Sequence, residues 1–217
     1  RPMCLRDRQF PENKFSDFML KGQHAGIAMA VKMAFKIDLA EIDKTFQNNA
    51  FRDAPVADGK FPLIIFSHGN GGFRMQSTFW CEHLASHGYI VVSPLGYHRR
   101  AWYGSRGYGI PRGAARAADE GTLPGNLGEL SEQDVLNVLA IAQEGYNIDD
   151  SRIYLWGHSR GGAGTYHLAA RYPEIWAGLA VAAPAPRRES LDEVEAFKDI
   201  PVLVLHGDAD ATVPVAG

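Results

Sequence analysis

The amino-acid sequence predicts an α/β fold with an open, doubly wound and mostly parallel sheet. Five short apolar runs, rich in β-branched residues, predict strands buried on both faces, because near-continuous hydrophobicity is typical of parallel sheets. These runs are residues 61–67, 89–93, 152–156, 177–182 and 201–205. Segments with helical spacing separate them, at residues 74–87, 131–144, 161–172 and 189–198. Strands and helices that alternate in this way imply right-handed crossovers within a single sheet.

Length and composition indicate one globular domain and exclude several classes of function. The 217 residues suffice for one substantial core, and 46% hydrophobic with 22% charged residues is ordinary for a globular protein. A net charge of −3 gives no sign of a nucleic-acid partner, and no apolar run reaches the ~20 residues of a membrane span. Cys4 and Cys81 are too few for a disulfide framework, and we expect Cys81 to be a buried thiol. The first residues carry no signal-peptide pattern, so we expect a soluble chain, whereas its compartment and oligomeric state are not predicted.

Two regions interrupt the alternation and set the predicted domain organisation. Residues 1–59 are expected to form a helical extension, with one helix over residues 16–43, packed on a core of residues 60–217. Within the core, residues 96–128 form a long loop, rich in Gly, Pro and Arg, after the second strand. Loops of this length are uncommon unless functional or disordered. After the loop, Ser131 is expected to cap the next helix at its N-terminus.

The motif Gly-His-Ser-Arg-Gly at residues 157–161 is the strongest chemical signal. It directly follows a predicted strand and opens a predicted helix, which is the setting of a nucleophile elbow. Small residues are needed two positions before and after Ser159, because the serine has strained dihedral angles and the neighbouring backbone passes close by. The helix N-terminus adds backbone N–H groups and a positive dipole end near a developing oxyanion. The pattern therefore predicts Ser159 as a catalytic nucleophile; a glycine-rich turn with an incidental serine is the alternative.

The segment His-Gly-Asn-Gly-Gly at residues 68–72 follows the first predicted strand, where an oxyanion-hole loop is expected. We predict that the two donors are the main-chain N–H groups of Asn70 and of Arg160, the residue after the nucleophile. A dinucleotide- or phosphate-binding loop is the alternative, but the spaced glycines, the downstream acid and a Gly-Lys-Ser/Thr sequence are missing. His68 is expected to be a structural, hydrogen-bonding histidine rather than the general base.

The segment His-Gly-Asp-Ala-Asp at residues 206–210 follows the last predicted strand. A carboxylate there lies at the carboxyl edge of the sheet, on the side of the Ser159 turn, where it can orient a histidine and stabilise its imidazolium form. Asp210, farther out on the loop, is the predicted acid, whereas Asp208 is expected to bond its own turn. A metal site that includes His206 is the alternative, which we do not favour because ligands at one strand end diverge.

The general base is the missing part of this constellation. In sites of this type the triad runs Ser, then Asp or Glu, then His along the chain, and no histidine follows Asp210. The histidines present are His24, His68, His83, His87, His98, His158, His167 and His206. His158 is expected to point away from the serine, and only His98, at the start of the long loop, stays open as a base. We therefore expect the catalytic His beyond Gly217 and a fold that is truncated at the C-terminus.

Two sets of segments resemble known proteins of the α/β-hydrolase superfamily. Residues 150–165, 170–177 and 200–214 resemble single-domain prolyl-oligopeptidase-like and polyhydroxybutyrate-depolymerase-like esterases. Residues 53–94 resemble dienelactone-hydrolase-like and platelet-activating-factor-acetylhydrolase-like enzymes. The combination of motifs in this order is specific for the superfamily but not for a substrate.

This resemblance implies an α/β-hydrolase fold and a role for each of four residues. Ser159 corresponds to the nucleophile, Asp210 to the acid, and Asn70 and Arg160 to the oxyanion donors. The sequence departs from the family pattern because it lacks the closing histidine, the segment that holds it, and clear copies of the usual first two strands. By comparison with the family, the fold is therefore expected to be truncated at the N-terminus as well.

The long loop is the candidate substrate-binding element, because it leaves the carboxyl edge of a strand and is expected to lie over Ser159. We predict that Tyr97, Trp102 and Tyr103 contact the substrate. Arginines accompany them at positions 99, 100, 106, 112 and 116. An aromatic or acidic substrate group suits this composition, and a solvated surface loop is the alternative.

These observations predict a serine hydrolase that cleaves a small-molecule carboxylic ester through an acyl-enzyme. A small serine peptidase of the prolyl-oligopeptidase type, acting on short peptides, is one alternative, and a non-catalytic binding protein that keeps the fold is another. Neither a metal nor an organic cofactor is implied. Residues 1–217 alone are expected to be catalytically incomplete.

Overall fold

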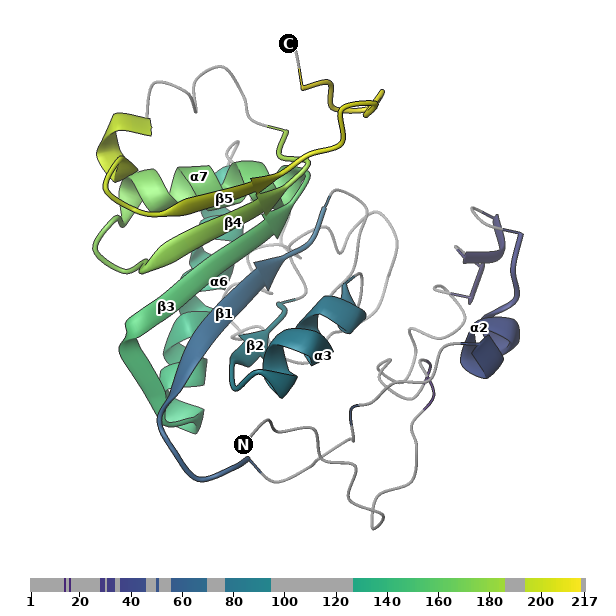
Figure 1. Cartoon of the computed structure of the whole chain (residues 1–217), viewed down its shortest axis with the longest axis horizontal. Helices are drawn as coiled ribbons and strands as arrows, with labels where there is room; N and C mark the ends of the chain where they lie inside the picture. The colour runs from purple at the N-terminus through teal and green to yellow at the C-terminus, as the bar shows by residue number, and fades with distance from the viewer. Residues whose placement is uncertain are drawn as a thin grey trace, which may run out of the picture.

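One parallel sheet forms the centre of the protein (Figure 1). The computed structural model describes residues 14, 16, 28–29, 31–33, 36–45, 50, 56–69, 77–94, 127–185 and 194–215. The strands are β1 (Phe61–Ser67), β2 (Ile90–Val92), β3 (Ile148–His158), β4 (Gly178–Ala182) and β5 (Val202–Leu205). All neighbouring strands pair in parallel. The predicted α/β fold is therefore confirmed, and each predicted strand is present, although β3 begins at Ile148 instead of residue 152.

The strand order places a topological reversal between β1 and β3. The order is β2-β1-β3-β4-β5, so the chain crosses from β1 to β2 on one side and then returns to β3 on the other. Open α/β sheets bind ligands at such a reversal, outside the carboxyl ends of the strands. The segments that begin at His68, after β1, and at Ser159, after β3, therefore lie where a ligand site is expected.

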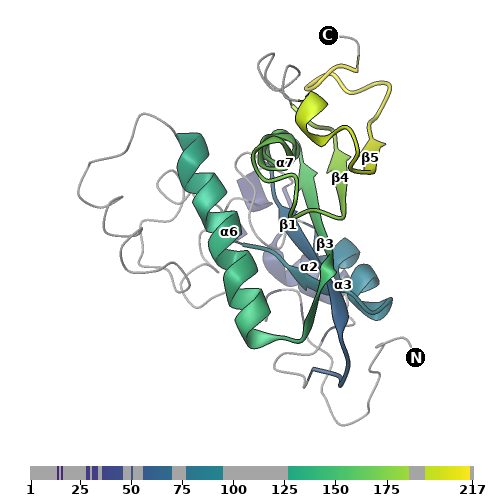
Figure 2. The same ribbon diagram turned by 90° about the vertical axis from the view of Figure 1, so that its left-hand side faces the viewer.

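Helices cover both faces of the sheet (Figure 2). They are α3 (Thr78–Ser86) on one face, and α6 (Leu127–Gly145) and α7 (Arg160–Arg171) on the other. Alternate residues of β1 face the two layers. Leu63 and Ile65 belong to the larger buried cluster with α6 and α7, whereas Ile64 and Phe66 pack with residues of α3. This burial on both faces explains why the strands are continuously apolar in the sequence.

The single helix predicted over residues 16–43 is wrong. Lys36 has a φ of 60°, which an α-helix does not accommodate, and α2 (Leu39–Thr45) begins after it. Lys36 N–H donates to the Lys32 carbonyl at 3.1 Å, so Lys36 ends the preceding helical segment. A lysine in the left-handed region has no signature in the sequence. The division into residues 1–59 and 60–217 stays a prediction.

Two helix predictions near the core also need correction. α6 begins at Leu127, so Ser131 lies inside the helix instead of capping it. The last predicted helix is described only from Val194 onward, where η2 (Val194–Phe197) is a 3-10 helix. None of the helices in the described ranges has the length and apolar content that crossing a membrane requires.

A buried carboxylate joins α6 to the end of α7. Glu132 is 8% exposed and accepts hydrogen bonds from His167 Nε2 at 2.9 Å and from the Tyr172 hydroxyl at 2.6 Å. Arg171 Nε lies 3.4 Å from the same carboxylate. Burial alone opposes ionisation of Glu132, but these donors and the arginine charge outweigh it and hold its pKa below the usual value.

We expect Glu132→Ala to lower the free energy of unfolding by about 2 kcal/mol or more at neutral pH, because hydrogen bonds to a charged acceptor are lost. Because the folded-state pKa is depressed, the contribution of Glu132 is present at neutral pH and disappears as the pH falls through that pKa. Urea unfolding at pH 7 and at acidic pH measures both effects. Glu195→Ala is the matched control, since Glu195 is exposed and forms its ion pair with Lys198, three residues along the same segment. Equal losses in the two variants at pH 7 would contradict this account.

β5 is an edge strand whose side chains are exposed on both faces. Val202, Leu203, Val204 and Leu205 are 40%, 57%, 52% and 45% exposed. In the part of the chain that the structure describes, β4 is its only strand neighbour. An exposed apolar edge is a template for pairing with another chain.

We expect the protein of residues 1–217 to self-associate through β5 and Leu203→Lys to shift it toward monomer in light scattering. A charge on the edge opposes strand pairing between two copies. Ile141→Lys adds the same charge to α6 at a residue that is 53% exposed, and is expected to leave association unchanged. If both substitutions acted equally, net charge and not the edge strand would explain the association.

Candidate active site

Ser159 alone connects the end of β3 to the start of α7. Its backbone angles, φ 54° and ψ −118°, are unfavourable for a residue with a Cβ atom and cost about 1–3 kcal/mol. Ser159 N–H donates to the Ala182 carbonyl at 2.8 Å. The Ser159 carbonyl accepts from Ala163 N–H at 3.1 Å and from Ala185 N–H at 3.2 Å. The surrounding backbone therefore holds Ser159 at the apex of a strand-to-helix turn.

The glycines on both sides of Ser159 leave no room for side chains. A Cβ atom on Gly161 would lie 2.7 Å from the His68 carbonyl oxygen and closer still to the Ser67 carbonyl oxygen. A Cβ atom on Gly157 would lie 2.5 Å from the hydroxyl oxygen of Thr165. The first turn of α7 is thus in direct contact with the backbone that follows β1. This is the close backbone approach that the sequence predicts around the serine.

Gly69 brings the segment after β1 beside Ser159. A Cβ atom on Gly69 would lie 3.2 Å from Ser159 Cβ and 2.9 Å from His158 Nδ1. Asn70 lies outside the described residues, so its role as an oxyanion donor stays a prediction. Arg160, the other predicted donor, is the first residue of α7, where backbone N–H groups have no partner within the helix.

His68 is buried in the same segment, at 7% exposed. Its Nδ1 donates to the Gly69 carbonyl at 2.8 Å. Burial lowers the pKa of His68, although this hydrogen bond opposes the shift. A neutral, hydrogen-bonded imidazole agrees with the structural role predicted for this histidine.

The Asp210 carboxylate is held by the turn that follows it. Oδ1 accepts from Thr212 N–H at 2.8 Å and from Val213 N–H at 2.9 Å. The hydrogen bonds from Val213 and Thr212, assisted by two nearby imidazoles, lower the pKa of Asp210. The carboxyl group is therefore ionised at neutral pH, as required of an acid that stabilises an imidazolium.

The two imidazoles belong to His206 and His158. His206 Nε2 is 3.7 Å from Asp210 Oδ2, and the charge of His158 also acts on this carboxylate. His158 at the end of β3 and Leu205 at the end of β5 both pair with Ala182 of β4, so the two strand ends lie at the same edge of the sheet. For His158, the sequence predicts only that its side chain points away from the serine. The contact between His206 and Asp210 was not predicted, and their spacing of four residues is the sequence feature that could have indicated it. The bond to its own turn that was predicted for Asp208 is made by Asp210, and Asp208 is exposed.

Other predicted residues lie outside the part of the chain that the structure describes. They are the substrate-binding candidates Tyr97, Trp102 and Tyr103 and the alternative base His98. Among the described residues, no three His, Cys, Asp or Glu side chains lie close enough together to bind a metal ion. The residues of the alternative metal site, 206–210, are among those described.

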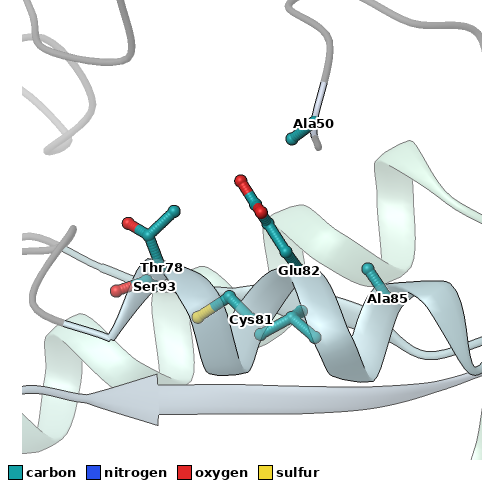
Figure 3. A pocket seen from close by; sticks show the side chains of 7 residues that line it. Ala50, Thr78, Cys81, Glu82, Ala85 and Ser93 are labelled. Atoms are coloured by element: carbon teal, nitrogen blue, oxygen red, sulfur yellow. The ribbon is translucent and has the colours of Figure 1, made fainter. Parts of the chain in front are cut away.

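A separate hollow of about 260 Å³ lies beside α3, where Glu82 points toward Ala50 (Figure 3). Its lining residues are Ala50, Thr78, Cys81, Glu82, Ala85, Val91 and Ser93. Cys81, predicted to be a buried thiol, is half-buried. Burial, with the Glu82 charge, raises the pKa of its thiol to about 11, so the thiol is protonated and unreactive at neutral pH. None of the predicted site residues lines this hollow.

Comparison with known proteins relates the chain to esterases. The family model for platelet-activating factor acetylhydrolase, isoform II, matches residues 18–101. NocK of Nocardia uniformis subsp. tsuyamanensis, a protein named as an esterase, is 27% identical over 197 residues, which are 88% of this chain and 52% of NocK. The bifunctional acetylxylan esterase/xylanase XynS20E of Neocallimastix patriciarum is 26% identical over 152 residues, 69% of this chain and 19% of that protein. The chain thus spans about half the length of NocK and less of XynS20E.

The fold is shared with a solved structure. The structure of a protein described as a predicted CIB-like hydrolase, from Thermoplasma acidophilum, has a TM-score of 0.51 at 22% identity and covers 74% of this chain and 69% of its own. The chain thus combines a parallel sheet that reverses between β1 and β3 with sequence similarity to proteins named as esterases. We conclude that the chain resembles the α/β-hydrolase superfamily and shares its fold.

Proposed function

We propose that the protein is a serine hydrolase that cleaves carboxylic esters through an acyl-enzyme on Ser159. The placement of Ser159 carries this proposal, because a strained serine lies between Gly69 and the N-terminus of α7. Backbone strain of this kind clusters at functional sites. The relatives named as esterases favour an ester as the substrate class.

In the proposed mechanism, the Ser159 hydroxyl attacks the ester carbonyl while a histidine accepts its proton. The carbonyl oxygen becomes an oxyanion that accepts hydrogen bonds from the N–H groups of Arg160 and Asn70. The histidine then protonates the departing alcohol, and the acyl group remains on Ser159. Water activated by the same histidine releases the acid and restores the serine. Asp210 orients the histidine and stabilises its imidazolium form.

We place the catalytic histidine beyond Gly217 in the natural protein. In this superfamily the histidine follows the acid along the chain, and residues 211–217 contain none. The lowered pKa of Asp210 supports its assignment as the partner of that histidine. The greater length of NocK, of which the chain spans 52%, is in keeping with this placement.

The substrate is proposed to be a small-molecule ester that contacts the loop carrying Tyr97, Trp102 and Tyr103. Their rings and the neighbouring arginines suit an ester with an aromatic or acidic group. No metal or organic cofactor takes part in the proposed steps.

Comparing acyl esters with peptidyl amides as substrates of the full-length protein tests the proposal. The expected result is faster ester turnover, with one fluorophosphonate adduct located on Ser159 by peptide mass mapping. Faster amide cleavage, with the adduct on the same residue, would identify a small serine peptidase instead. A protein that shows neither turnover nor adduct would be a binding protein that keeps the fold, and the proposal would be wrong.

A further inference from the structure

The loop after β5 is closed by hydrogen bonds at several points. Asp210 N–H donates to the Gly207 carbonyl at 3.2 Å, which forms the first turn. The Asp210 carboxylate accepts the N–H groups of Thr212 and Val213, which form the second turn. His206 Nε2 donates to the Val213 carbonyl at 2.7 Å and so joins the end of β5 to the far end of the loop. The hydrogen bond between His206 and Val213 therefore closes the loop that contains Asp210.

The His206 ring lies beside the Asp210 carboxylate, at ion-pair distance but without a hydrogen bond to it. Its Nε2 atom is 3.7 Å from Asp210 Oδ2, which is too long for a hydrogen bond. The Nε2 proton is instead used by the Val213 carbonyl. The two backbone N–H donors both bind Oδ1, so the other oxygen, Oδ2, is the one suited to accept a proton donor from a further residue.

Both side chains of this pair are partly shielded from solvent. The His206 side chain is 15% exposed and the Asp210 side chain 22% exposed. Hydrogen bonds that are shielded from water hold a geometry more firmly than exposed ones, because the local dielectric constant is lower. A bond from His206 to Val213 therefore restricts the segment that carries both N–H donors to Asp210.

We propose that His206 is a positioning residue for the acid of this site: its bond to Val213 fixes the loop so that Asp210 Oδ2 meets the catalytic histidine. This role rests on the proposed function, since it requires Asp210 to act as the acid. His206 contacts neither the substrate nor the reacting atoms and acts only through Asp210.

Loss of the donor on His206 leaves the Val213 carbonyl without this partner and loosens the Asp210 turn. A misplacement of ~1 Å in a group that acts on the reacting atoms costs up to ~10²-fold in rate. We expect about a tenfold loss of kcat with KM changed less than about twofold, because the acid is displaced but the substrate contacts are not.

A matched pair of variants in the full-length protein tests the role. His206→Phe keeps a ring in place but removes the donor, whereas His206→Gln keeps an N–H at a similar reach from the backbone. The expected result is a lower kcat for His206→Phe and recovery of most of it in His206→Gln. Should His206→Phe fail to fold in a thermal melt, His206→Ala makes the same comparison with His206→Gln.

A double-mutant cycle with Asp210→Asn separates positioning from a general structural effect. If His206 acts through Asp210, His206→Phe adds no further loss of kcat in the Asp210→Asn background. An equal tenfold loss in both backgrounds, or an unchanged kcat in His206→Phe, would overturn the inference.

Ser159→Ala, measured alongside, distinguishes failure of this inference from failure of the proposed function. Ester hydrolysis that survives Ser159→Ala would overturn the function and the inference with it. Hydrolysis that is lost in Ser159→Ala but unchanged in His206→Phe would overturn the inference alone.

Discussion

Ser159→Ala is expected to lower kcat for a simple ester by about 10⁴- to 10⁶-fold in the full-length protein, because the variant lacks the hydroxyl that is proposed to form the acyl-enzyme. KM is expected to change little, because the hydroxyl contributes to bond formation and not to binding of the remote parts of the substrate. Initial rates with a chromogenic acyl ester measure both quantities. The fluorophosphonate adduct disappears in the same variant.

Ser151→Ala is the matched control for this loss. Ser151 lies on β3 as well, but its hydroxyl donates to Asp149 Oδ1 at 2.7 Å, near the opposite end of the strand. Its replacement is expected to leave kcat unchanged. If Ser159→Ala retained more than about a tenth of the wild-type kcat, Ser159 would not be the nucleophile.

Gly161→Ala is expected to destabilise the protein by about 3 kcal/mol or more, or to prevent folding, because it overpacks a contact between two backbones. The added Cβ atom would meet the carbonyl oxygens of Ser67 and His68. Main-chain atoms cannot rotate away as a flexible side chain can, so α7 has to move off the end of β1. Because the same contact places Ser159 beside Gly69, any folded variant is expected to lose ester hydrolysis as well.

Gly164→Ala provides the comparison within the same helix. Gly164 is also in α7, but a Cβ atom there would meet nothing within 4 Å. Alanine is the better helix former, so we expect Gly164→Ala to raise the free energy of unfolding by about 0.5–1 kcal/mol. Urea unfolding of both variants gives the two values, and similar effects would show that crowding at Gly161 is not the cause.

The parts of the fold that the sequence predicts are those with a local pattern. The strands follow from continuous apolar runs, and the turn at Ser159 follows from glycines between a strand and a helix. The break at Lys36 has no such pattern, because a positive φ at a lysine is imposed by its surroundings. The same holds for the start of α6, where Ser131 has the residue type of a cap but lies inside the helix.

The candidate site divides in the same way. Ser159 and Asp210 could be predicted because each follows a recognisable strand. The contacts of His206 and the hydrogen bonds that join Glu132 to α7 could not, because they form between side chains and backbone that meet only after the chain has folded. Glu132 and His167 are 35 residues apart in the sequence, so no local sequence pattern can indicate their contact.

The unfavourable backbone angles of Ser159 have a consequence for engineering and for evolution. Glycine adopts positive φ without strain, so Ser159→Gly is the replacement that stability alone favours at this position. A library selected only for heat resistance would therefore enrich glycine here and discard the hydroxyl. Any programme to stabilise this protein has to couple survival to turnover, and a descendant released from selection for turnover would gain stability by abandoning this residue first.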